Sequence, residues 1–223
     1  MSGLVQSSIA RKVVMALSGL FLVIFLAQHF TINVTSVLAP ETFNEWSHFM
    51  GYNGLVQFVL QPILIGGVVV HFVMGIVLEL QNNKARKIKY KKYSGGSNAS
   101  WFSRNMIITG AVVLAFLGLH FYDFWIPEMD YKYIEGAAMD PTRYYPETVH
   151  KFESLPRTLI YVGAFVLLAM HLWHGFASSF QTVGVNNKYS PAIANFTKIY
   201  AIAIPAGFIF IALYHYFNPL TSP

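Results

Sequence analysis

The chain has 223 residues, of which 55% are hydrophobic and only 11% are charged, against about 25% charged residues in an ordinary soluble domain. It contains no cysteine, which excludes thiolate-bound iron–sulfur clusters, disulfides and thioether-attached cofactors. Its formal net charge of +5 comes without a basic face interleaved with aromatic residues, which indicates contact with lipid headgroups rather than with nucleic acid.

Five apolar stretches are each long enough to cross a bilayer, which takes about 20 residues. In chain order they are residues 13–38, 55–80, 106–126, 159–180 and 192–217. The first follows Arg11-Lys12 as a signal peptide would, but its apolar run is too long and no clear cleavage site follows. We therefore predict an all-α fold, a single domain over residues 1–223 built as an integral membrane bundle of five transmembrane helices.

Lysine and arginine predict the orientation of this bundle. They are concentrated before the first stretch, in the loop after the second stretch (residues 81–104) and before the fifth stretch. Because basic residues are enriched in cytoplasmic loops, we expect the N-terminus in the cytoplasm and the C-terminus outside. The loop 127–157 then lies outside and is too short to be a catalytic domain, so we interpret it as an outer cap. The chain also has no glycine-rich phosphate-binding motif.

Four histidines lie inside four different apolar stretches, and each has a glycine at a repeated offset. The repeats are Ser18-Gly19 ten positions before His29, Thr109-Gly110 ten positions before His120, His71 four before Gly75, and His171 four before Gly175. An ionisable ring at membrane depth is costly and is usually functional. Four such rings in two matched pairs indicate two haems, each held between two imidazoles.

Depth along the helices predicts how the histidines pair. At about 1.5 Å rise per residue, His29 and His120 lie roughly 24–25 Å beyond the basic residues that precede their stretches. His71 and His171 lie roughly 21–28 Å from the opposite side. We therefore expect His29 to face His120 near the outer surface (the outer pair) and His71 to face His171 nearer the cytoplasm (the inner pair).

The glycines support two cofactor levels. Gly19 and Gly110 lie roughly 15 Å nearer the cytoplasm than the outer histidines, at the level of the inner pair. Gly75 and Gly175 lie one turn beyond the inner histidines. A glycine there removes side-chain bulk where a flat macrocycle presses against a helix, although glycines also serve ordinary helix packing in membranes.

The remaining histidines have simpler interpretations. His174 lies one turn after His171 and competes with it, but it lacks the following glycine at the same offset. His215 has no partner at its level, and His48 and His150 lie in predicted loops. These three are interpreted as structural, solvent-facing or quinone-site groups.

The sequence resembles the di-haem cytochrome b membrane anchor of bacterial succinate:quinone oxidoreductases. These enzymes are the succinate dehydrogenases and fumarate reductases of the menaquinone type. The resemblance runs from about Arg11 into the fifth stretch, and its specificity lies in the ordered set of pieces with these spacings rather than in any single piece. The matching pieces are residues 24–29, 43–50, 70–75, Thr109-Gly110 before His120, and 171–175 leading to 182–184.

The resemblance implies two b-type haems as cofactors, with an inner ligand pair on helices two and four. It implies a flavoprotein subunit that oxidises succinate and an iron–sulfur subunit at the cytoplasmic face, in the cytoplasmic (inner) membrane of a bacterium. Electrons would leave the iron–sulfur subunit, cross the two haems and reduce menaquinone; this chain itself would have no succinate-oxidising site. Assembly into a higher oligomer is left open. Some relatives carry a glutamate two residues before the fourth ligand, where this chain has Ala169, so a proton route of that kind is not expected here.

Quinone reduction takes up two protons and needs donors at the membrane edge. We predict Glu45 and His48 as the proton donors of a quinone site. Asn33 and Asp123, near the outer pair, are further candidates for this role. Each is also compatible with an ordinary polar helix end. Two other classes stay open: the cytochrome b subunit of another quinone-linked enzyme, of hydrogenase or nitrate reductase type, and a transporter with a histidine proton relay. The transporter is disfavoured because Glu79 and Asp123 are expected only at the edges of the bilayer.

Overall fold

The computed structural model describes residues 7–85, 106–185 and 189–220. Within these ranges the chain is all-helical and contains no strand. Five helical runs are long and apolar enough to cross a membrane: Ser8–Leu38, Val56–Lys84, Met106–Ile134, Leu155–Thr182 and Ser190–Phe217. The predicted fold class, a bundle of five such helices, is therefore confirmed. Most of the basic loop 81–104, on which the predicted orientation depends, lies outside the described residues.

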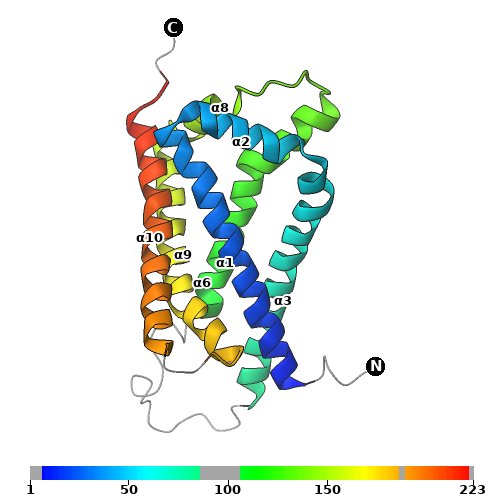
Figure 1. Cartoon of the computed structure of the whole chain (residues 1–223), viewed down its shortest axis with the longest axis vertical. Helices are drawn as coiled ribbons and strands as arrows, with labels where there is room; N and C mark the ends of the chain where they lie inside the picture. Colours follow the sequence, from blue (N-terminus) through cyan, green and yellow to red (C-terminus); the bar gives the residue numbers. More distant parts are fainter. Residues whose placement is uncertain (1–6, 86–105, 186–188, 221–223) are drawn as a thin grey trace.

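The helices form an upright bundle with one covered end (Figure 1). Helix α1 (Ser8–Leu38) crosses the bundle diagonally and contacts α3 (Gln61–Ala85), α9 (Leu155–Thr182) and α10 (Ser190–Phe217). Helices α9 and α10 pack along each other, and α6 (Met106–His120) packs against α9. Two shorter helices, α2 (Pro40–Tyr52) and α8 (Tyr144–Phe152), lie across the end where α1 finishes, and we call this the capped end.

Segment 40–52, predicted as a connection between two membrane helices, is helical. Pro40 occupies the first turn, where its missing N–H costs nothing, and the helix buries Phe43 and Gly51 against the bundle. Glu45 and His48 thus lie on α2 rather than in a loop.

The third membrane run is longer than the sequence predicts. We expected it to end at residue 126, before Pro127, but it continues through the π-helical turn η2 (Phe121–Trp125), α7 (Ile126–Met129) and a second π-helical turn, η3 (Asp130–Ile134). A proline cannot donate to the carbonyl four residues before it, and a wider π turn accommodates that missing bond. The turn η1 (Val56–Leu60) precedes Pro62 in the same way.

The other boundaries differ by less. Helix α1 begins at Ser8 rather than residue 13, and α9 begins at Leu155 with Pro156 in its first turn rather than at residue 159. The run that includes α3 extends to Ala85. The predicted loop 127–157 is consequently mostly helical, and only its middle part is irregular.

The densest apolar packing lies towards the capped end, between α8, α9 and α10. Phe152, Tyr161, Phe165, Phe208 and Ile211 form a buried cluster there, with Phe30 and Phe116 packed against it from α1 and α6. Helix α3, by contrast, contacts α6 only sparsely, so the four helices that carry the predicted ligands enclose space rather than a filled core.

Candidate functional site

One large cavity runs through the bundle between α1, α3, α6 and α9. Its volume is about 1450 Å³, whereas a site for one drug-sized ligand has roughly 300–1,000 Å³. Most of its wall is apolar, with polar residues at its two ends. All eight residues predicted to surround the cofactors line it: His29, His71, His120, His171, Gly19, Gly75, Gly110 and Gly175.

The outer pair meets near the capped end. The ring centroids of His29 on α1 and His120 on α6 are 5.7 Å apart, and the ring planes stand at 88°. Aromatic side chains surround them: Phe25 stacks on His29 at 5.5 Å, and Phe124 lies 5.1 Å from His120. Both imidazoles remain partly exposed, because they line the cavity.

The inner pair meets farther from the capped end. The ring centroids of His71 on α3 and His171 on α9 are 6.3 Å apart, with an interplanar angle of 77°. The Nδ1 atom of His71 lies 3.1 Å from the Ser18 hydroxyl of α1, and Nδ1 of His171 lies 3.3 Å from the Thr109 hydroxyl of α6. Each inner histidine is thus held by a third element of the cavity wall.

The glycines lie where depth along the helices predicts. A Cβ atom on Gly19 would stand 3.2 Å from Cε1 of His71, and one on Gly110 would stand 3.4 Å from Cε1 of His171. These two glycines lie against the inner imidazole rings, with the tighter fit at Gly19. Their contact with a macrocycle stays a prediction. Gly75 and Gly175 face methionine side chains instead. A Cβ atom on Gly75 would stand 3.8 Å from the methyl carbon of Met15, and one on Gly175 would stand 3.3 Å from the methyl carbon of Met106.

These residues fit a metal held between two imidazoles. A metal–imidazole bond is about 2 Å long, so two nitrogens on opposite sides of one metal place their ring centroids about 6 Å apart. Both observed separations, 5.7 and 6.3 Å, match that distance. No cluster of three or more His, Cys, Asp or Glu side chains occurs among the described residues, so a simple protein-ligated metal ion fits less well than a metal whose remaining ligands come from a macrocycle.

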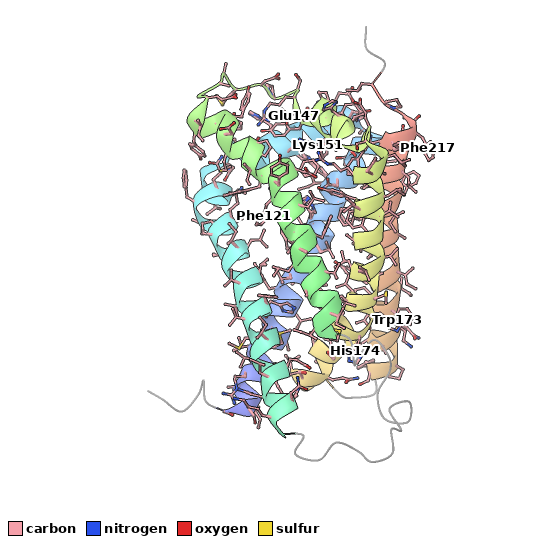
Figure 2. The ribbon with its side chains drawn as sticks, turned by 180° about the vertical axis from the view of Figure 1, so that it is seen from behind. Phe121, Glu147, Lys151, Trp173, His174 and Phe217 are labelled. Carbon is pink, nitrogen blue, oxygen red and sulfur yellow. The ribbon has the colours of Figure 1, made fainter. Side chains whose placement is uncertain are left out.

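The other histidines lie away from the four facing rings. His174 does not line the cavity, and Figure 2 shows it near the end opposite the cap, so the geometry favours His171. His215 is fully buried, with Nε2 2.9 Å from the Ser36 hydroxyl between α10 and α1. His150 is exposed and paired with Glu153 at 2.9 Å.

A buried carboxylate lies beside the outer pair. Asp123, on the π turn η2 just after His120, is 1% exposed and lines the cavity. Its Oδ2 accepts a hydrogen bond of 2.8 Å from the Tyr161 hydroxyl, and its Oδ1 lies 3.2 Å from Nη1 of Arg157. The Arg157 side chain is one-third exposed, so this ion pair connects the cavity with the surface. Asp123 therefore lies inside the third run, which extends beyond residue 126 to Ile134.

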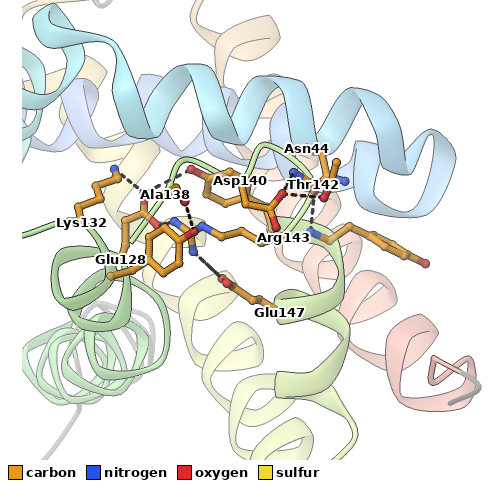
Figure 3. Close-up of polar contacts among 11 residues, drawn as sticks. Asn44, Glu128, Lys132, Ala138, Asp140, Thr142, Arg143 and Glu147 are labelled. Carbon is orange, nitrogen blue, oxygen red and sulfur yellow. Dashed lines mark hydrogen bonds and ion pairs between the residues drawn. The ribbon is translucent and has the colours of Figure 1, made fainter. Parts of the chain in front are cut away.

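The capped end is closed by a network of charges (Figure 3). Glu128 accepts from both Lys132 and Arg143, Arg143 also pairs with Glu147 at 2.9 Å, and Lys132 donates to the carbonyl oxygen of Gly51 on α2. The Arg143 guanidinium stacks over the rings of Tyr131 and Tyr144. This network fastens segment 127–157 to α2. Sequence reasoning missed it because the segment was interpreted as a loop and its contact with Gly51 joins residues 81 positions apart.

The network also shifts the acid–base behaviour of its members. Burial, reinforced by the Glu128 carboxylate, raises the pKa of Tyr144 well above its ordinary value. Burial and Glu128 raise the pKa of Tyr52 in the same direction. The pKa of Arg143 is raised by its bonds to Glu147 and Glu128, which outweigh its desolvation. The tyrosines are therefore neutral, and Arg143 is charged, at every physiological pH.

The predicted quinone residues fall into two groups. Asn33 and Asp123 line the cavity, whereas Glu45 and His48 do not. Glu45 is exposed on α2. His48 packs its ring 4.7 Å from that of Tyr52 and 6.3 Å from that of Tyr144, behind the charged network.

Comparison of the chain with protein-family models, with curated proteins and with solved structures found no match.

Proposed function

We propose that this chain is the membrane anchor and electron-transfer subunit of a bacterial succinate:menaquinone oxidoreductase, with two b-type haems held by His29 and His120 and by His71 and His171. The observation that carries the proposal is the presence of two facing imidazole pairs, at two depths of one cavity about 1450 Å³ in volume. A bound bis-histidine haem supplies one-electron redox chemistry.

The chain's own residues hold and shield these groups. The four histidines come from four different helices, so each pair also ties two helices together across the cavity. Aromatic rings around the outer pair and apolar side chains along the wall give the imidazoles a mainly apolar surrounding. A low-dielectric surrounding and fixed ligands are the means by which a protein tunes a redox group.

Orientation and partners follow from charge. The basic residues in the first turns of α1, in loop 81–104 and around the start of α10 favour a cytoplasmic N-terminus by the positive-inside rule. The capped end would then lie outside. The inner pair then lies on the side where an iron–sulfur subunit, with its flavoprotein partner, would deliver electrons. The basic loop is suited to dock an acidic partner surface there.

Menaquinone reduction requires protons at the site where the quinone binds. Asp123 is the best-placed candidate because it lines the cavity beside the outer pair and its ion pair with Arg157 reaches towards the surface. Glu45 and His48 stay candidates only for a quinone bound outside the cavity, against α2.

A second candidate function is the cytochrome b subunit of another quinone-linked oxidoreductase, of hydrogenase or nitrate reductase type. It would use the same paired histidines with a different soluble partner. Succinate is the proposed electron donor because the ordered set of motifs resembles the membrane anchors of succinate:quinone oxidoreductases.

The test is to purify the protein with its native partners and record a reduced-minus-oxidised spectrum together with the haem-to-protein ratio. Two haems per chain are expected. His29→Ala or His120→Ala should remove one of them, His71→Ala or His171→Ala the other, and His174→Ala neither. A wild-type protein without haem refutes the proposal. Copurification of hydrogenase or nitrate reductase subunits, without succinate oxidation, would favour the second candidate.

A further inference from the structure

Two pairs of helices repeat one arrangement around the inner histidines. On α1, the Ser18 hydroxyl lies 2.9 Å from the Met15 carbonyl oxygen and 3.1 Å from Nδ1 of His71. On α6, the Thr109 hydroxyl lies 3.0 Å from the Met106 carbonyl oxygen and 3.3 Å from Nδ1 of His171. In both cases one hydroxyl bridges a carbonyl of its own helix and an imidazole of another.

The chemistry of these contacts fixes the imidazole tautomer. A carbonyl oxygen can only accept, so the hydroxyl hydrogen of Ser18 is donated to the carbonyl of Met15. The hydroxyl oxygen can then serve His71 only as an acceptor, and Nδ1 of His71 must carry the ring hydrogen. The Nε2 lone pair is left free to bind a metal. The bridge made by Thr109 assigns the same tautomer to His171.

Packing around each bridge holds the ring in place. The glycine that follows each hydroxyl residue, Gly19 or Gly110, lies against Cε1 of the same imidazole. The methionine whose carbonyl closes the bridge places its methyl group against the glycine one turn beyond the histidine, Met15 on Gly75 and Met106 on Gly175. The motif is therefore Met-x-x-Ser/Thr-Gly on one helix matched with His-x-x-x-Gly on another, and it occurs twice.

The outer pair lacks this support. Nδ1 of His120 is buried with no hydrogen-bond partner among the described residues. The Asn33 amide nitrogen lies 3.4 Å from Nδ1 and 3.5 Å from Nε2 of His29, and an amide NH₂ group can only donate. The two pairs thus differ at Nδ1: each inner imidazole has a hydroxyl acceptor there, and the outer imidazoles have none among the described residues.

We propose that Ser18 and Thr109 are positioning residues for the inner haem: their hydroxyls accept from Nδ1–H of His71 and His171, orient both rings and strengthen Nε2 as a ligand. This inference rests on the proposed function. A hydrogen bond from the far nitrogen raises the basicity of a metal-bound imidazole. A more basic ligand stabilises the oxidised metal, so removing either hydroxyl raises the reduction potential of the inner haem and leaves the outer haem unchanged.

The experiment is a redox titration of the purified complex, followed optically and by the electron paramagnetic resonance of the low-spin haems. Ser18→Ala and Thr109→Val are compared with Ser18→Thr and Thr109→Ser, which keep the hydroxyls. Thr31→Val and Thr197→Val are matched controls, since those hydroxyls bond carbonyls of their own helices at 2.9 and 3.0 Å and do not line the cavity.

The expected result is an upward shift of one of the two redox transitions, with a changed resonance signal of that haem, in Ser18→Ala and Thr109→Val only. If a hydroxyl-free variant loses the inner haem, the hydroxyl-bearing variant must retain it; loss in both overturns the inference. Two loaded haems with unchanged transitions in Ser18→Ala and Thr109→Val also overturn it, while leaving the proposed function intact. A wild-type protein without haem overturns the proposed function itself.

Discussion

Replacement of Gly19 by alanine tests how tightly α1 is fitted to the inner histidine. The new Cβ atom would stand 3.2 Å from Cε1 of His71 and 3.4 Å from the Ser179 hydroxyl. The first distance is shorter than nine in ten real contacts of this kind, so the imidazole must move by a few tenths of an ångström. That movement directly disturbs the 3.1 Å contact between Nδ1 of His71 and Ser18.

Overpacking of this kind costs about 1–3 kcal/mol. If the proposed inner haem is bound there and the strain falls on its bound state, retention of that haem is weakened by about 5- to 150-fold. The assay is the rate of haem transfer from the purified protein to an excess of a haem-scavenging globin. We expect one of the two haems to leave faster in Gly19→Ala, while the other leaves at the wild-type rate.

Two glycines provide controls of graded severity. Gly110→Ala places its Cβ at 3.4 Å from His171, an ordinary contact, so its effect should be much smaller. Gly163 on α9 has no neighbouring atom within 4 Å, and alanine there should be neutral or stabilising by about 0.5–1 kcal/mol, since glycine weakens a helix interior. Equal haem release from the Gly19→Ala and Gly163→Ala variants would contradict a tight fit between α1 and His71.

Three further predictions concern the capped end and the quinone. Arg143→Met leaves the Glu128 carboxylate with one partner fewer. We expect the free energy of unfolding to fall by about 3 kcal/mol, the lower limit for a broken buried ion pair, because the second partner of Arg143, Glu147, is half exposed. Thermal unfolding in detergent measures this loss, and an unchanged midpoint contradicts it. The pKa of Tyr144 is raised above its ordinary value of 10.0 in the folded protein, so its contribution to stability is complete below pH 10 and is lost as the pH rises further. Tyr144→Phe should therefore flatten the alkaline decline of the unfolding temperature, and an identical decline in both proteins argues against it. Asp123→Asn should lower quinone reduction while succinate oxidation by a soluble acceptor is retained; a loss in Glu45→Gln or His48→Ala instead would move the quinone to α2.

Much of the architecture could be predicted from the sequence, because a bilayer imposes its thickness on every segment that crosses it. Five apolar stretches of sufficient length predicted five helices, and rise per residue alone placed His29 level with His120 and His71 level with His171. The predicted ligand roles and the haems themselves stay predictions. Helix ends were predicted less well, since a π turn let the third run pass Pro127 and a proline-initiated helix replaced the connection at 40–52.

Rotation about each helix axis, and contacts between distant segments, were decided only by the tertiary structure. The sequence favoured His171 over His174 by depth and by its following glycine, but only the packing shows that His171 lines the cavity and His174 does not. The repeated Ser/Thr-Gly pair was visible in the sequence, and its depth matched the inner pair. The sequence could not show that each hydroxyl contacts the histidine of another helix. The Glu128–Arg143 network and the Asp123–Tyr161–Arg157 contacts likewise join separate segments. Local composition determines which segments enter the membrane; which faces then meet depends on side-chain packing between helices, and that has no signature within a single helix.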